Sequence, residues 1–163
     1  DALGVDTGPT NIDLILDPVN GPKIIEVGAR IGATCLPELI KIHCGIDWVK
    51  ATVMTSLGEV ADLKVGPLQP CAASIVESPA DGYFYDVKMP GDVDSDKQIV
   101  GVEVSSSRGD RVSILRNGSN RIGKVISTGR SAEEAEISAR NYKSKIEIVV
   151  KDDNPFEYNE KIL

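Results

Sequence analysis

Two strand-like runs joined by one turn constrain this chain more than any other feature. Residues 11–16 (Asn-Ile-Asp-Leu-Ile-Leu) and 23–28 (Lys-Ile-Ile-Glu-Val-Gly) are rich in branched apolar residues, which is typical of β-strands. The Pro-Val-Asn-Gly sequence at 18–21 is a turn signal. This segment therefore predicts an antiparallel hairpin.

The hairpin brings two acidic residues together. If residues 18–21 form the loop and Asp17 faces Pro22, the antiparallel ladder sets Asp13 opposite Glu26, with both side chains on one face. Their Cβ atoms then lie roughly 5 Å apart. Two carboxylates that close repel when both are ionised, so either one pKa rises or a cation lies between them. Mg²⁺, which proteins bind through one or two carboxylates and phosphate oxygens, meets that need.

Arg30 adds a positive charge to the same face if the second strand extends that far. Side chains alternate along a strand, so Glu26, Gly28 and Arg30 project to the side of Asp13. The guanidinium suits a phosphate or carboxylate bound at two points, and Gly28 leaves the backbone open to a ligand. An ordinary alternative remains, in which the acids are solvent-exposed and Arg30 neutralises them in a surface ion pair worth about 0–1 kcal/mol.

Four segments of the chain resemble one enzyme family. Residues 8–13 (Gly-Pro-Thr-Asn-Ile-Asp), 21–30 (Gly-Pro-Lys-Ile-Ile-Glu-Val-Gly-Ala-Arg), 36–40 (Leu-Pro-Glu-Leu-Ile) and 121–136 are similar to the C-terminal part of ATP-grasp ligases. L-amino acid ligases and the purine-pathway carboxylate–amine ligases are the members that the chain resembles. The resemblance covers most of residues 1–150.

This resemblance implies roles for the residues of the hairpin. In the family an acid of the first strand and a glutamate of the second hold Mg²⁺ (or Mn²⁺) on the ATP phosphates, roles that fall here on Asp13 and Glu26. Arg30 would be the catalytic residue of the acyl-phosphate step, and Asn11, Gly28 and Glu26 would contact the cofactor ATP. Asp13 stands where Glu is common and Gly28 where Asn is common; the Gly-Ala-Arg sequence favours the amino acid ligase branch.

The predicted fold class is α+β. After the hairpin, we expect one helix at about 34–44, capped by Thr34, and a second from Asp47 to near Gly58. From residue 70 on, short runs between turns predict a small, mainly antiparallel β unit with one late helix. Its strands are expected at 71–76, 83–89, 99–105, 111–115, 121–127 and 146–150, and its helix at 131–143.

Three parts are expected along the chain. Residues 1–60 would be the metal- and phosphate-binding part of an ATP-grasp catalytic subdomain with an antiparallel sheet and helices. Residues 61–150 would be a β-rich C-terminal subdomain, whose late helix opens with a capping box of Ser131 and Glu134, and 151–163 a tail. The adenine pocket, phosphate-binding lysine and Gly-rich loop of the family lie upstream of the matching segments, so we expect a fragment.

Composition limits the kinds of partner and the cellular location that we expect for this chain. The net charge of −7, from 18 basic and 25 acidic residues, gives no basic stripe for nucleic acid. No run approaches the roughly 20 apolar residues of a membrane-spanning helix, so no membrane partner is expected. Three cysteines without a Cys-x-x-Cys pair favour reduced thiols and a cytoplasmic location.

The predicted function is that of part of an ATP-dependent carboxylate–amine ligase. ATP would phosphorylate a small-molecule carboxylate, and an amine would attack the acyl phosphate to form an amide or peptide bond. Two alternatives stay open: a non-catalytic module of ATP-grasp ancestry for assembly or anion binding, and a carboxylase that uses carboxyphosphate. The sequence identifies neither substrate, and it leaves open whether the protein forms a homo-oligomer.

Overall fold

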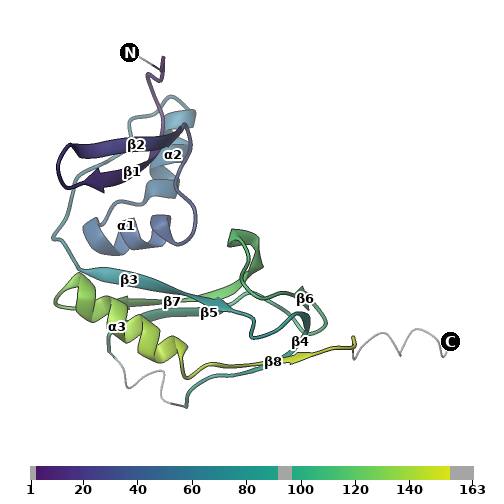
Figure 1. The fold of residues 1–163 in the computed structure, drawn as a ribbon. Coiled ribbons are helices and arrows are strands. Elements are labelled where there is room, and N and C mark those ends of the chain that lie inside the picture. Colours follow the sequence, from purple (N-terminus) through teal and green to yellow (C-terminus); the bar gives the residue numbers. More distant parts are fainter. Residues whose placement is uncertain (1–2, 92–96, 155–163) are drawn as a thin grey trace. The chain divides into compact units, whose positions relative to one another are not determined.

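The computed structural model describes residues 3–91 and 97–154 and divides into two compact units, Asp1–Leu68 and Gln69–Leu163 (Figure 1). In the described residues, every strand pairs antiparallel with its neighbours, and three α-helices accompany the sheets. The α+β class is therefore confirmed. None of the described helices has the length and apolar character needed to cross a bilayer.

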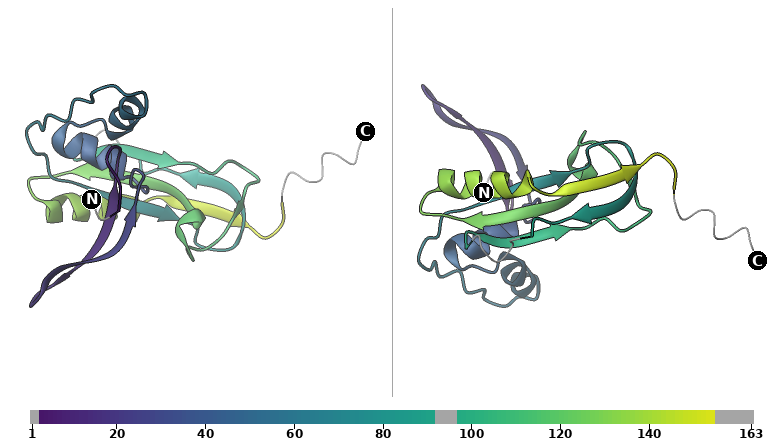
Figure 2. Two further views of the ribbon diagram at one scale, coloured as in Figure 1. Left: turned by 90° about the horizontal axis from the view of Figure 1, so that it is seen from above. Right: turned by 90° about the horizontal axis from the view of Figure 1, so that it is seen from below.

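The first unit consists of a hairpin followed by two helices. Strand β1 (Asn11–Asp17) pairs with β2 (Gly21–Gly28), and the pair forms a long twisted ribbon (Figure 2). Helices α1 (Leu36–Cys44) and α2 (Trp48–Ser56) follow. As predicted, the Asp47 side chain caps α2, where it accepts the N–H of Lys50.

The start of α1 differs from the prediction. Cys35, not Thr34, directly precedes the helix, and no side chain caps it. Thr34 and Cys35 have φ values of 52° and 69°, in the left-handed region that residues other than glycine seldom adopt. A capping residue has an extended backbone instead, which is why Thr34 does not fill that role.

The second unit contains two three-stranded sheets and one helix. The order of the first sheet is β3-β7-β5, formed by Cys71–Glu77, Arg121–Thr128 and Ile99–Val104. The order of the second is β6-β4-β8, formed by Arg111–Val112, Gly82–Lys88 and Glu147–Lys151. Helix α3 (Ala132–Lys143) packs on β3 and β7, and a 3₁₀ turn, η1 (Gly118–Asn120), precedes β7 (Figures 1 and 2).

One hydrophobic core joins these elements of the second unit. Val125 of β7 is fully buried, and Phe84 of β4 and Tyr142 of α3 are 3% exposed. The remaining buried members are Val76, Val112, Ile122 and Ala139. Burial of an aromatic residue such as Phe84 removes a large apolar area from water, so this core is the main source of stability in the unit.

Strand β6 ends after Val112, whereas the sequence predicted a strand to residue 115. The Asp81 carboxylate explains the difference. It accepts the Ile114 N–H at 2.9 Å and is held by Arg116 through two bonds of 2.9 and 2.8 Å. The Ile114 N–H therefore binds Asp81, and the backbone does not continue as a strand beyond Val112. The Arg116 guanidinium, and then the Ile114 N–H, lower the pKa of Asp81 to about 2.

Asp81→Asn is expected to lower the melting temperature at pH 7, because the charged acceptor of Arg116 is lost. A carboxylate whose pKa is depressed on folding stabilises the fold above its ordinary pKa of 3.8, and this contribution is lost as the pH falls toward 2. Thermal melts of the two proteins should therefore converge across that range. Asp153→Asn is the control, since Asp153 makes no hydrogen bond or ion pair with the described residues; an equal effect there would contradict the assignment.

Candidate functional site

The β1–β2 ladder places Asp13 directly opposite Glu26, as the sequence predicted. The loop that does so is shorter than expected. Asp17 pairs with Gly21, not with Pro22, so residues 18–20 alone form the turn. A bulge next to Asp13 leaves Ile25 outside the pairing and restores the predicted partner.

Asp17 shapes this turn. Its Oδ1 accepts the N–H groups of Val19 and Asn20 at 2.8 and 2.9 Å, and Gly21 takes a left-handed φ of 76°. The Asn20 N–H, and then the Val19 N–H, lower the pKa of Asp17 to about 2. Asp17 is therefore an acid of the turn and not a third member of the site.

Asn11, Asp13 and Glu26 share one side of the hairpin. Asn11 donates from Nδ2 to Asp13 Oδ1 at 3.1 Å, and its cross-strand neighbour is Gly28. Both carboxylates are solvent-exposed. Within residues 3–91 and 97–154, neither Asp13 nor Glu26 has an ion-pair partner, so two neighbouring negative charges lack a counter-ion from the protein.

Arg30 lies just beyond the end of β2 and folds back along Gly28. Its N–H donates to the Gly28 carbonyl at 2.8 Å, and its Cγ and Nε lie 3.6 and 3.7 Å from the point that a Cβ on Gly28 would occupy. Its Nη1 donates to the Ile31 carbonyl at 2.9 Å. The guanidinium therefore lies next to Gly28 and forms no ion pair with Asp13 or Glu26 among the described residues. The alternative of a simple surface ion pair requires such a contact.

The donor set fits a hard divalent cation completed by a ligand. Two carboxylates and one amide offer oxygen atoms, and Mg²⁺ in proteins often takes one or two carboxylates and fills its other positions with phosphate oxygens and water. In the part of the chain that the structure describes, no group of three or more His, Cys, Asp or Glu side chains is placed to hold a metal ion. The hairpin therefore fits a metal ion whose remaining ligands are phosphate oxygens and water.

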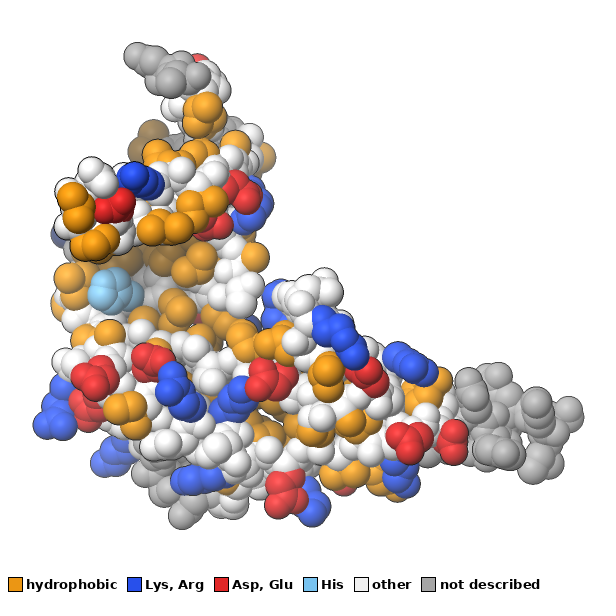
Figure 3. Space-filling view, viewed as in Figure 1, with side chains coloured by type: hydrophobic (Ala, Val, Ile, Leu, Met, Phe, Trp, Pro, Cys, Tyr) orange, Lys and Arg blue, Asp and Glu red, His pale blue; other side chains and the backbone are white. Residues whose placement is uncertain are grey.

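The hairpin also exposes much apolar surface, visible over β1 and β2 in Figure 3. Six large apolar side chains of the two strands are 49–73% exposed, and a contiguous exposed set of this kind is unusual on a soluble protein, whereas single exposed apolar residues are common. These residues are Ile12, Leu14, Ile15, Leu16, Ile24 and Ile25. Within the first unit, nothing described covers them.

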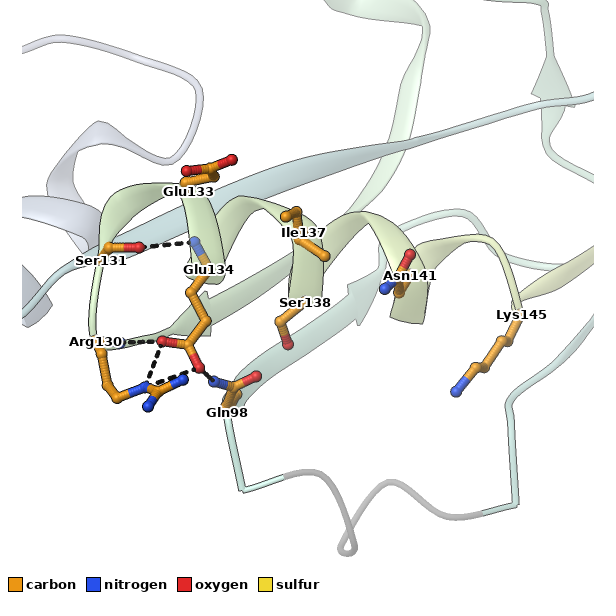
Figure 4. Close-up of a pocket in the computed structure, with 9 residues that line it drawn as sticks. All are labelled: Gln98, Arg130, Ser131, Glu133, Glu134, Ile137, Ser138, Asn141 and Lys145. Carbon is orange, nitrogen blue, oxygen red and sulfur yellow. Dashed lines mark hydrogen bonds and ion pairs between the residues drawn. The ribbon is translucent and has the colours of Figure 1, made fainter.

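A groove of about 610 Å³, which the sequence did not reveal, runs along α3 (Figure 4). Ser131 caps the helix by accepting the Glu134 N–H at 3.1 Å. Only half of the predicted capping box forms, because the Glu134 carboxylate accepts the Arg130 N–H at 2.8 Å and the Gln98 amide at 3.0 Å. The Arg130 side chain, and then its N–H, lower the pKa of Glu134. This network secures the start of α3.

Comparison with known proteins identifies relatives for both units. Residues 74–151 match the family L-amino acid ligase C-terminal domain 2. The chain is also 28% identical over 138 residues to the uncharacterised protein y4rH of Sinorhizobium fredii, an alignment that covers 83% of this chain and 28% of that protein.

Two solved structures extend the comparison. Phosphoribosylglycinamide synthetase from Anaerococcus prevotii is 25% identical with a TM-score of 0.79 and aligns with 92% of this chain and 39% of its own. L-amino acid ligase from Bacillus licheniformis is 24% identical with a TM-score of 0.75 and aligns with 93% of this chain and 38% of its own. The chain therefore spans less than two fifths of these relatives, and it has the fold of the C-terminal portion of ATP-grasp ligases, the family that its sequence resembles.

Proposed function

We propose that this chain supplies the metal- and phosphate-binding face of an ATP-dependent carboxylate–amine ligase. One observation carries the proposal: Asp13 and Glu26 face each other without an ion-pair partner among the described residues, while the Arg30 side chain lies along Gly28 and donates to the Ile31 carbonyl instead. Residues that only needed mutual neutralisation would lower their energy by pairing. Uncompensated acids are instead what a bound metal ion requires.

Each residue of the face has a distinct task in this proposal. Asp13 and Glu26 would hold Mg²⁺ or Mn²⁺, which supplies charge compensation for the ATP phosphates. Asn11 orients Asp13 through its amide, and Gly28 would admit the nucleotide beside the Arg30 side chain, which lies along it. The free guanidinium edge of Arg30 would bind the oxygen atoms of the reacting carboxyl group as negative charge develops there.

The substrates would be a small-molecule carboxylate and an amine. ATP transfers its γ-phosphoryl group to the carboxylate, and the amine then displaces phosphate to form the C–N bond. The segment that follows Ile31 would border the amine side of the pocket. The family match at residues 74–151 and the two ligase structures support this class of reaction. A cytoplasmic location, where ATP is available, forms part of the proposal.

The exposed apolar side chains of the hairpin agree with a site that is completed by further protein. An ATP-grasp ligase encloses its nucleotide between two subdomains, and water must be kept from an acyl phosphate. Ile15 and Leu16, which are 59% and 73% exposed, present the kind of surface that such a segment would cover. The activity assays below therefore use the longest natural protein that contains this chain.

Glu26→Gln is expected to reduce amine-dependent ADP release by at least about a hundredfold, because one charge of the metal site is removed. ADP release with Mg²⁺ and pooled amino acids measures it, and Mn²⁺-induced broadening of the Asp13 and Glu26 amide signals tests metal binding in this chain directly. Glu59→Gln is the matched control, since Glu59 is an exposed acid of the same unit. Undiminished turnover in the Glu26 variant would refute the metal assignment.

Arg30→Lys keeps the positive charge but loses the planar guanidinium, which can donate two parallel hydrogen bonds. Turnover is therefore expected to fall at least about tenfold. The melting temperature should change little, because Arg30 is exposed and, among the described residues, its side chain donates to the Ile31 carbonyl alone. Initial rates at saturating ATP and a thermal melt give the two readouts. Unchanged kinetics in this variant would show that Arg30 has no role in the chemical step.

Gly32→Ala tests whether Asn11 orients Asp13. A Cβ on Gly32 would lie 2.9 Å from Asn11 Oδ1 and 2.5 Å from Leu36 Cδ1, so both side chains must shift. The Asn11 side-chain amide signals should move in a ¹H–¹⁵N spectrum, and Mn²⁺ affinity should weaken. Gly101→Ala is the control, because its nearest neighbour, Ile126 Cβ, is at an ordinary 3.8 Å. Unchanged Asn11 signals would contradict this positioning role.

The carboxylase alternative must be separated from the ligase by its dependence on bicarbonate, because both classes share this fold. The biotin carboxylase domain of 2-oxoglutarate carboxylase bound to bicarbonate shares the fold with a TM-score of 0.64. ADP release that requires bicarbonate and not an amine would favour it over the ligase. Absence of ADP release together with absence of metal and nucleotide binding would favour a non-catalytic module.

A further inference from the structure

The first unit contains a pocket that the proposed metal site does not use. It has a volume of about 370 Å³, at the small end of the range of about 300–1,000 Å³ for ligand pockets. Residues 6–9, which precede β1, form one wall, α2 forms another, and Leu63 completes the described lining. We call this cavity the α2 pocket.

One side of α2 supplies much of the apolar surface of the α2 pocket. Four residues of the helix line it at the i, i+3, i+4, i+7 spacing of a single helix face: Trp48, Ala51, Thr52 and Thr55. Leu63, which is 60% exposed, adds an aliphatic side chain. A ligand with an aliphatic stem would therefore cover apolar surface here.

The hydroxyl groups of α2 in this pocket are hydrogen-bond acceptors. Thr52 donates its hydroxyl hydrogen to the Trp48 carbonyl at 2.8 Å, and Thr55 donates to the Ala51 carbonyl at 2.8 Å. A hydroxyl that has donated its hydrogen keeps its lone pairs and can accept from a ligand. These two groups therefore favour a ligand that donates hydrogen bonds.

Asp6 gives the α2 pocket a negative charge. Its carboxylate is exposed and forms no ion pair with any residue in 3–91 or 97–154. None of the described lining residues is Lys, Arg or His. Asp62 and Lys64, which flank Leu63 in the sequence, carry opposite charges, so together they do not offset the charge of Asp6.

Other cations of the first unit interact elsewhere. Lys41 pairs with Asp47 at 2.8 Å, and Lys50 also lowers the pKa of Asp47 through its charge. Lys23 pairs with Asp17 at 3.4 Å. The charge of Asp6 is thus left for a positively charged ligand.

The α2 pocket begins close to the proposed metal site. Pro9 lines the pocket and is two residues before Asn11, and two residues of extended chain span at most about 7 Å. Helix α2 also belongs to the segment after Ile31, which borders the amine side in the proposed function. An amine substrate that reacts beside the metal can therefore extend a side chain into the pocket.

An alkylammonium chain matches all of these features. Such a chain covers apolar surface with its methylene groups and keeps its charged head at a polar group. The ammonium has three hydrogen-bond donors and no acceptor, and both a carboxylate and the face of an indole ring attract it. An anionic side chain would instead be repelled by Asp6, and a neutral apolar one would leave its charge uncompensated.

We propose that the α2 pocket binds the basic side chain of the amine substrate, a lysine-like alkylammonium group. The aliphatic stem lies along Ala51 and Leu63, and the terminal ammonium meets Asp6 and the Trp48 ring. The substrate role rests on the proposed function, whereas binding of an alkylammonium group by the pocket does not. Asp6 would therefore determine which amines the enzyme prefers.

Trp48 reports binding directly, because it is the single Trp of the 163-residue chain. Lysine amide should change the Trp48 emission saturably at millimolar concentrations. Norleucine amide, which lacks the terminal amine, should bind at least about threefold more weakly. This difference should shrink as salt is added, and Asp6→Asn should abolish it.

Glu59→Gln is the matched control, since Glu59 is an exposed acid of the same unit outside the described lining of the pocket. It removes the same charge as Asp6→Asn and should preserve the difference between the two amides. Circular dichroism confirms that each variant is folded.

ADP release by the longest natural protein that contains this chain tests the substrate role. The two amides act as amine substrates only, because their carboxyl groups are blocked. The increase in ADP release over pooled amino acids alone should give a kcat/KM at least about threefold higher for lysine amide than for norleucine amide. Asp6→Asn should bring this ratio close to one, and Glu59→Gln should preserve it.

The two assays separate the binding site from its role in the ligase. Lysine amide that leaves Trp48 emission unchanged, or that binds no better than norleucine amide, would refute the alkylammonium site. Equal kcat/KM values for the two amides would refute the substrate role. Absence of ADP release with every amine, while Trp48 still responds to lysine amide, would refute the proposed ligase and this substrate role but confirm the alkylammonium site.

Discussion

The register of the β1–β2 hairpin is the constraint on which the proposed site depends. Because side chains alternate along a strand, a shift of one residue would move Glu26 to the face opposite Asp13. The turn alone does not give the observed pairing. With Asp17 opposite Gly21, an uninterrupted ladder would set Asp13 against Ile25. The bulge at Ile25 inserts the missing residue, so a local irregularity, and not the strand pattern, brings the two carboxylates together.

The second unit depends on two close backbone approaches. A Cβ on Gly123 of β7 would overlap the Glu103 carbonyl of β5, and a Cβ on Gly82 would lie 2.5 Å from the Lys151 carbonyl of β8. Glycine at these two positions therefore allows the strands to pair at normal distance.

Local patterns predicted most of the strands and helices, but not the interactions that modify them. The Asp13–Glu26 pair followed from spacing, yet through a loop that is one residue too long and a ladder without a bulge, two errors that cancel. Thr34 was predicted as a cap because its residue type fits, while its left-handed φ excludes that role. The end of β6 depends on Asp81, more than 30 residues earlier in the chain, and no local pattern contains such a contact.

The proposed metal site does not follow from the net charge of −7. Coulomb interactions between exposed groups decay over about 8 Å at physiological salt, so a partner responds to the charges within its own contact area. What matters there is which charges the protein leaves without a partner. Among the described residues, Asp13 and Glu26 are left so on the hairpin. A sum over the whole sequence does not reveal this pair of acids, because strand register, which composition does not record, brings them together.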